Sequence, residues 1–159
     1  MRITCAGRAA ERNSGENPCP AISTGSISAE PTKQKEDAAV RAALDAVRRA
    51  GMNKRVEYIS FSKNICEQLI ANGPKGIKVA YLGGDLSPRE LAERGYTGLD
   101  YHIGTMRAHE EWFDEARELG LEINVWTVDD AETMKYLIEK GVDYITTDEP
   151  ELLQSLLGE

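Results

Sequence analysis

Two segments decide the fold class of this chain: Ile123-Asn124-Val125-Trp126-Thr127-Val128-Asp129-Asp130 and Gly141-Val142-Asp143-Tyr144-Ile145-Thr146-Thr147-Asp148-Glu149-Pro150. Each contains an apolar run rich in β-branched residues, ends in acidic residues, and leads directly into a helical pattern. Such runs are typical of parallel strands that are followed by a helix. The two segments therefore predict consecutive βα units of a parallel α/β protein.

Similar apolar segments occur upstream of this pair, at 56–61, 77–82 and 98–103. The gaps between them have room for helices, and the helix signals are present. Ser87-Pro88-Arg89-Glu90 is a capping box with proline at the first helical position, and predicts a helix over Pro88–Arg94. An amphipathic pattern over Gln34–Gly51 predicts a helix before the first strand. The repeat predicts a parallel sheet with right-handed crossovers.

The beginning of the chain has a different composition. Gly, Pro, Ser, Asn and Thr are frequent over residues 13–31, and neither the helical nor the strand period is present there. We therefore expect residues 1–30 to form an irregular segment and residues 31–159 to form the α/β domain.

Length and charge limit the possible architectures and partners. At 159 residues the chain is shorter than the roughly 250 residues of a typical eight-stranded βα barrel, so we expect a barrel that is incomplete or not closed. No apolar run approaches the roughly 18 residues of a membrane span. A net charge of −8 and a pI near 4.9 disfavour nucleic acid as a partner, because clustered Lys and Arg bind phosphate backbones.

The cysteines and the first residues bear on the cellular compartment. The chain has an odd number of cysteines, Cys5, Cys19 and Cys66, and no two of them have CxxC spacing. This pattern indicates neither a disulfide framework nor a zinc site. Met1–Gly15 contains several Arg residues and no apolar core of a signal peptide. A cytoplasmic location is the prediction that follows.

Four segments resemble the glycerophosphodiester phosphodiesterase family: Tyr58-Ile59-Ser60-Phe61, Val79-Ala80-Tyr81-Leu82, Trp126-Thr127-Val128 and Ile145-Thr146-Thr147-Asp148. The resemblance extends from about Lys35 to Leu157. It implies strands four to eight of a TIM-type barrel of the PLC-like phosphodiesterase kind, with about five to six of the eight βα units. It also implies a lineage of enzymes of lipid metabolism that hydrolyse glycerophosphodiesters to an alcohol and glycerol 3-phosphate.

The family's catalytic residues belong mainly to the preceding strands, where the resemblance is weaker. Ile3–Ala9 resembles the strand of the family's His-Arg-Gly motif, with Gly7 in place of the His and Arg8 as the possible remnant. The Glu-x-Asp motif and a second His of the family have no counterpart, and Glu30 is the carboxylate nearest to the remaining metal position. The family uses Mg²⁺ or Ca²⁺ with two His residues that transfer protons. We therefore expect no bound divalent ion and no activity in this chain alone.

A ligand site is expected at the carboxyl ends of the strands, as in other βα barrels. Those ends carry Ser60, Phe61, His102, Trp126 and Asp148. The resemblance implies that Trp126 forms a wall for the glycerol group of a glycerophosphodiester or glycerol 3-phosphate-like ligand, although a packed strand residue would have the same pattern. His102 either lines this pocket or is a packed, hydrogen-bonded residue, and His109 is expected at the surface or as a helix cap.

Two classes of function remain open. The first is a phosphodiesterase lineage, and the second is a non-catalytic fragment that binds a small phosphorylated ligand or a partner chain. A receiver-like domain is disfavoured because Asp129-Asp130 follows the fourth repeat strand and not the first, and helix capping by Asp129 explains that pair better than a metal site. A serine hydrolase is disfavoured because no Gly-x-Ser-x-Gly elbow occurs.

An incomplete barrel also predicts self-association. Its edge strands have unpaired backbone groups, and we expect inner side chains such as Val79, Tyr81 and Val125 to be partly uncovered.

Overall fold

The computed structural model describes residues 2–5 and 33–158, with side chains only for the second range. Its elements in chain order are β1 (Arg2–Cys5), α1 (Lys33–Arg49), β2 (Glu57–Ser60), α2 (Lys63–Asn72), β3 (Lys78–Tyr81), α3 (Pro88–Glu93), β4 (Gly98–His102), α4 (Ile103–Ala108), α5 (Glu111–Glu118), β5 (Glu122–Trp126), α6 (Ala131–Lys140), β6 (Tyr144–Thr147) and α7 (Pro150–Leu157). Strands alternate with helices from β2 onward, as the sequence predicts.

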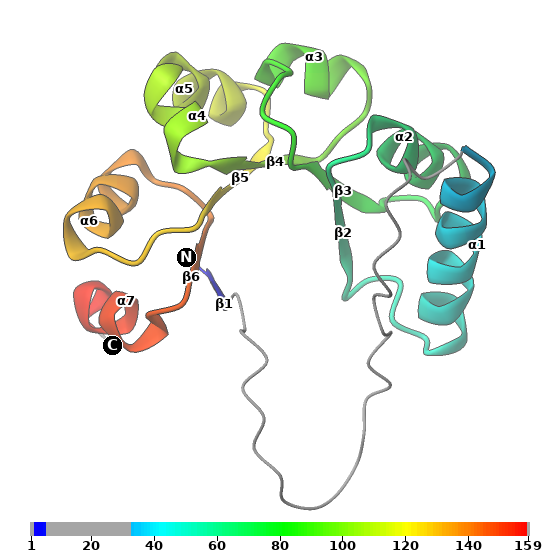
Figure 1. Ribbon diagram of the computed structural model, residues 1–159, viewed down its shortest axis with the longest axis horizontal. Coiled ribbons are helices and arrows are strands. Elements are labelled where there is room, and N and C mark those ends of the chain that lie inside the picture. Colours follow the sequence, from blue (N-terminus) through cyan, green and yellow to red (C-terminus); the bar gives the residue numbers. More distant parts are fainter. Residues whose placement is uncertain (1, 6–32, 159) are drawn as a thin grey trace, which may run out of the picture.

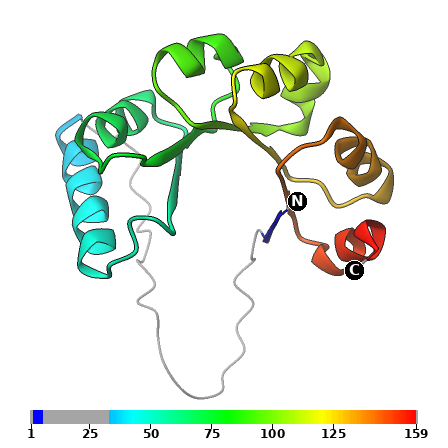
Figure 2. The ribbon, with the colours of Figure 1, turned by 180° about the vertical axis from the view of Figure 1, so that it is seen from behind.

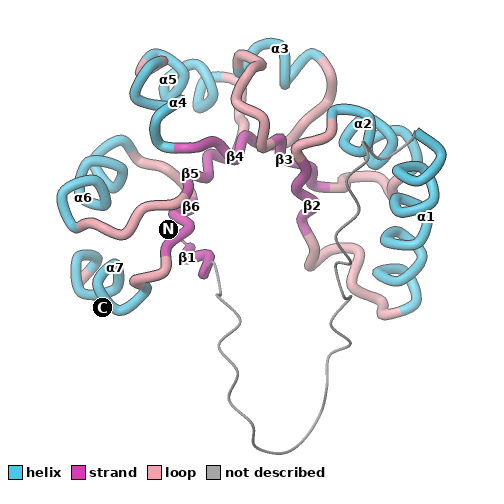
Figure 3. Tube along the Cα trace, in the orientation of Figure 1, coloured by secondary structure: helices cyan, strands magenta, loops and turns pink. Residues whose placement is uncertain are grey.

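The strands form one parallel sheet, which is strongly curved. It has six strands in the order β1-β6-β5-β4-β3-β2. The helices lie on the convex side of the arc, and the strands line its concave side (Figure 1); the view from behind shows the same arrangement (Figure 2). Strands β1 and β2 are the two edges and lie at opposite ends of the arc (Figure 3). The predicted partial barrel is confirmed.

Strand β1 is a correction to the prediction that residues 1–30 are irregular. Its four residues pair in parallel with β6, from Arg2 beside Tyr144 to Cys5 beside Thr147. An edge strand has unpaired backbone N–H and C=O groups, and a short parallel neighbour satisfies them on one side of β6. The remainder of the segment, including Arg8 and Glu30, lies outside the described residues.

The hydrophobic core lies between the sheet and the helices. Side chains that alternate along the strands, such as Val79, Tyr81 and Val125, are at most 3% exposed and belong to one cluster with Phe113 and Leu137 of the helices. The expectation that these three strand residues face the barrel interior is therefore wrong. Successive side chains of a strand point to opposite faces, so the concave face receives their neighbours.

The helix caps agree with the sequence at one site and differ at another. The capping box of α3 is present: Ser87 Oγ accepts from Glu90 N at 3.3 Å, and Glu90 Oε2 accepts from Ser87 N at 2.8 Å. At α6 the cap is Asp130, which accepts from Thr133 N at 2.8 Å, and not Asp129. The reason is that α6 begins at Ala131, which places Asp130 at the capping position.

Asp129 instead joins the ends of two neighbouring strands. Its Oδ1 accepts from Thr147 Oγ1 at 3.0 Å and from Asp148 N at 2.8 Å, which links the loop after β5 to the end of β6. Among the helices that the structure describes, none is long and apolar enough to cross a membrane.

Candidate ligand site on the concave face

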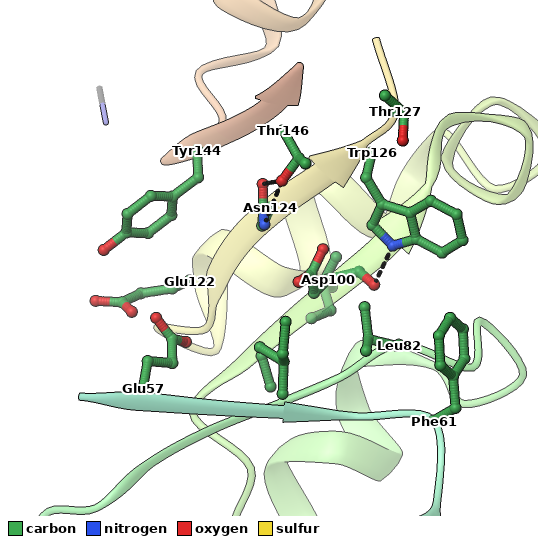
Figure 4. Close-up of a pocket in the computed structure, with 13 residues that line it drawn as sticks. Glu57, Phe61, Leu82, Asp100, Glu122, Asn124, Trp126, Thr127, Tyr144 and Thr146 are labelled. Atoms are coloured by element: carbon green, nitrogen blue, oxygen red, sulfur yellow. Dashed lines mark hydrogen bonds between the residues drawn. The ribbon is translucent and has the colours of Figure 1, made fainter. Parts of the chain in front are cut away.

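A cavity of about 530 Å³ lies against the concave face of the sheet (Figure 4). Strands β2 to β6, with the residues that follow some of them, supply its lining. Because the strands are parallel, their carboxyl termini all lie at one side of the cavity and their amino termini at the other. We describe the cavity from its carboxyl-terminal side through its middle to its amino-terminal side. The three parts differ in chemistry.

The end at the carboxyl ends of the strands is aromatic. Trp126 is the last residue of β5, and its Nε1 donates to the backbone O of Asp100 at 2.9 Å. The ring of Phe61 meets the Trp126 ring edge to face, with centroids 5.9 Å apart and an interplanar angle of 88°. Phe61 is 63% exposed, so this aromatic wall is open to a ligand. The Trp126–Thr127 peptide bond is cis.

The middle of the cavity is polar and comes from three adjacent strands. Asp100 of β4 lies beside Asn124 of β5 in the register, and Asn124 Nδ2 donates to Thr146 Oγ1 of β6 at 3.1 Å. Asp100 is only 3% exposed, and its Oδ1 has no hydrogen-bond partner among the described residues. Burial raises the pKa of Asp100 to about 6; the neighbouring Asn124 amide opposes the shift, and the charge of Glu57 adds to it.

The end at the amino ends of the strands is acidic. Glu57 and Glu122 lie side by side there with Tyr144 (Figure 4). Burial and the charge of Glu122 raise the pKa of Glu57, and Lys78 opposes them. Lys78 forms an ion pair with Glu122, yet the Oε2 of Glu122 is buried without a hydrogen-bond partner in the described part of the chain.

Gly98 allows the close approach of β4 and β5 at this end. A Cβ atom on Gly98 would lie 2.8 Å from the backbone O of Glu122, a distance that requires one of the strands to shift. Glycine at this position therefore helps to hold Glu122 and Asp100 against the same cavity.

The structure brings together some of the predicted site residues. Phe61 and Trp126 line the cavity, and the ring of His102 lies 5.2 Å from that of Trp126. Ser60 and Asp148 are not part of the lining: Ser60 Oγ accepts from Ser62 N at 3.0 Å, and Asp148 is an exposed residue after β6. Whether these residues bind a substrate stays a prediction.

The two His residues serve as helix caps. His102 Nδ1 accepts from Gly104 N at 3.0 Å and caps α4, so His102 is hydrogen-bonded and also contacts the aromatic wall. His109 ends α4 and stacks on Trp112, with ring centroids 4.1 Å apart. The prediction of a surface or capping role for His109 is confirmed.

The sequence analysis missed the polar lining: Glu57, Asp100, Glu122, Asn124, Tyr144 and Thr146. A signal was present in the alternation of side chains along each strand. If Trp126 faces the cavity, Asn124 and Glu122 must face it too, and Val125 must face the helices.

The described residues do not form a metal site. No three His, Cys, Asp or Glu side chains in residues 33–158 lie close enough together to hold an ion. Whether this chain binds the divalent ion of the family stays a prediction, and the predicted remnants Arg8 and Glu30 lie outside the described residues.

The fold and the site define a parallel α/β protein of the open-barrel kind, with a cavity on its inner face. The model of the glycerophosphoryl diester phosphodiesterase family matches residues 10–152. The chain belongs to this family. A comparison with curated proteins gives no match.

Solved structures of the family share the fold. A glycerophosphodiester phosphodiesterase from Parabacteroides distasonis is 43% identical with a TM-score of 0.78, and the match covers 82% of this chain and 54% of that one. A putative glycerophosphoryl diester phosphodiesterase from Silicibacter pomeroyi is 27% identical with a TM-score of 0.70, covering 78% and 45%. A phosphodiesterase from Oleispira antarctica, solved in complex with the product sn-glycerol-3-phosphate, is 17% identical with a TM-score of 0.65, covering 82% and 53%. This chain spans about half the length of these relatives.

Proposed function

We propose that this chain binds the glycerol 3-phosphate part of a glycerophosphodiester at the aromatic end of its cavity and does not hydrolyse the diester on its own. The observation that carries the proposal is Trp126, which lies at the carboxyl end of β5 with its ring fixed by the hydrogen bond to Asp100. A fixed aromatic face beside an open cavity suits the C–H groups of a small polyol.

The family and its chemistry support both halves of this proposal. The Oleispira antarctica relative was solved with sn-glycerol-3-phosphate, although its low identity carries only the fold to this chain. Hydrolysis by the family requires the His and Glu-x-Asp residues that have no counterpart in this sequence. Loss of a single member of such a catalytic unit removes orders of magnitude in rate. A role in lipid metabolism and a cytoplasmic location stay predictions of the sequence.

Two measurements test the proposal. In an assay with glycerophosphocholine and Mg²⁺ or Ca²⁺, we expect no release of glycerol 3-phosphate above a blank without protein. Release of glycerol 3-phosphate that a chelator abolishes would overturn the proposal that the chain does not hydrolyse the diester. In a Trp112→Phe background, we expect added sn-glycerol 3-phosphate to change the fluorescence of Trp126. If the fluorescence does not change up to millimolar ligand while the circular dichroism spectrum shows an intact fold, the proposal that the chain binds glycerol 3-phosphate is overturned.

Trp112 is the suitable background because it lies away from the cavity. It packs against Tyr101 and stacks on His109, on the helix side of the sheet. Inorganic phosphate at the same concentration is the matched control, since it reproduces the charge of the ligand without the glycerol group.

A second candidate function, association through the open barrel, is favoured by the edge strand β2. Its outer edge has no neighbouring strand among the described residues, and Ile59 and Phe61 there are 56% and 63% exposed. An exposed strand edge with apolar side chains is a template for pairing with another chain. We infer that self-association uses this edge, and not the core residues Val79, Tyr81 and Val125.

A further inference from the structure

The middle of the cavity contains a carboxylate with one oxygen that accepts no hydrogen bond from the described residues. Asp100 is 3% exposed, its side chain lies at the centre of the lining (Figure 4), and its Oδ1 has no partner among the described residues. Of the neighbouring donors, Trp126 Nε1 donates to the backbone O of Asp100. Asn124 Nδ2 donates to Thr146 Oγ1 and also lowers the pKa of Asp100, but it leaves Asp100 Oδ1 without a partner among the described residues. A buried acceptor without a donor is costly, so this position favours a ligand that brings a donor.

The charge around Asp100 has the same sign. Glu57 and Glu122 line the same cavity, and Lys78 is already paired with Glu122. None of the described residues that line the cavity is a Lys, Arg or His. Low-dielectric walls strengthen the resulting negative potential, so the donor should belong to a cation. The same potential keeps the phosphate of the glycerol 3-phosphate ligand proposed above out of this part of the cavity, at the open aromatic end.

Apolar side chains supply much of the remaining lining, which favours an organic cation over a metal ion as the ligand. Ile59 of β2, Ala80 of β3 and Leu82 after β3 line the same cavity as Asp100. Figure 4 shows Leu82 between Asp100 and Phe61 of the aromatic wall. The described residues contain no cluster with metal-ligand geometry. A volume of about 530 Å³ is within the range of small-molecule sites, which is about 300–1,000 Å³.

We propose that the concave cavity binds a primary alkylammonium compound, with its N–H groups donating to Asp100 and its hydrocarbon part against Ile59 and Leu82. Glu57 and Glu122 attract the cation, and Asp100 provides the directional contact. Because the contacts lie in the middle and toward the acidic end of the cavity, this site does not rest on the proposed glycerol 3-phosphate site.

The test uses hexylammonium and hexanol as a matched pair of probes on the full chain, followed by ligand-observed NMR at about pH 7.5, where the amine is protonated. Hydrogen bonds to charged groups are worth about 1.5–3 kcal/mol, so hexylammonium should bind at least about tenfold more tightly than hexanol. Equal affinities would show that the cavity only absorbs hydrocarbon and would overturn the proposal. A failure of hexylammonium to bind would also overturn the proposal.

Variants then locate the contact. Asp100→Asn should weaken hexylammonium binding about tenfold or more and leave hexanol binding unchanged. The control Asp114→Asn makes the same change of charge on α5, where the side chain is 81% exposed, and should have no effect. Equal losses in the two variants would mean a general effect of net charge and would overturn the site. If Asp100→Asn does not fold, Glu57→Gln replaces it, with a severalfold loss expected and unchanged affinity contradicting the proposal.

Discussion

The two faces of the sheet differ in how well they are covered, although the same strands supply both. On the convex face, Val79, Val125 and Ile145 are fully buried beneath helices. The concave face carries the exposed Ile59 and the buried Asp100, whose Oδ1 has no hydrogen-bond partner among the described residues. The convex face therefore contributes most of the stability, whereas the concave face retains the polar and apolar groups that can bind a ligand.

The largest expected effect comes from one substitution made on both faces. Ile145→Ala removes a side chain that is 0% exposed and should lower the free energy of unfolding by about 2–5 kcal/mol. Ile59→Ala makes the same chemical change at a residue that is 56% exposed and should cost less than about 1 kcal/mol. Urea unfolding measures both values. Equal losses would mean that the concave face is covered in solution.

The second prediction concerns the buried carboxylate. Because its pKa is raised to about 6 in the folded state, Asp100 is destabilising above that pH, and the penalty disappears as the pH falls toward its ordinary value of about 4. Asp100→Asn should therefore stabilise the protein by about 1–3 kcal/mol at pH 8. Near pH 4 the variant and the parent should have similar stability.

The measurement is the difference in unfolding free energy between the two proteins across the pH range. Glu57, which lines the same cavity and whose pKa is also raised, is present in both proteins, so its contribution largely cancels in this difference. A gap that stays constant from pH 4 to pH 8 would contradict the role of Asp100.

The third prediction tests the helix layer on the convex side. Asp130→Ala removes the side-chain cap of α6 and should cost about 1 kcal/mol. The control Asp114→Ala, at an exposed ion pair on α5, should change the stability by less than about 0.5 kcal/mol. A cost at Asp130 no larger than the control would mean that the cap contributes nothing to the layer.

Much of the fold could be predicted from the sequence because its signals are local. The repeated apolar runs determine the order of strands and helices, and Ser87 and Glu90 identify a helix start directly. The family resemblance extends this to a partial barrel. The short strand β1 was indicated only by the family resemblance of Ile3–Ala9, because its pairing with β6 joins the two ends of the chain and leaves no local signal.

The site was harder to predict because it depends on contacts between strands. A shift of one residue decides whether Val125 or Trp126 faces the cavity, and an apolar run alone does not fix that choice. Asp100 Oδ1 has no partner among the described residues because of how Asn124 and Trp126 are bonded, which no local sequence pattern contains. Ser60 and Asp148 were included because they lie at the carboxyl ends of strands, although neither lines the cavity.

The smallest expected effect on stability is at the open edge, where the effect on association should be the largest. Phe61→Ser changes a residue that is 63% exposed, and should alter the unfolding free energy by less than about 0.5 kcal/mol. If β2 and its apolar side chains mediate self-association, the parent should form oligomers at tens of micromolar in light scattering, and the variant should shift toward the monomer. The control Leu119→Ser removes an exposed apolar residue near the end of α5 on the convex side and should leave the oligomers intact. A monomeric parent would show that the concave face is stable without a partner chain, which would leave small ligands as its only proposed occupants.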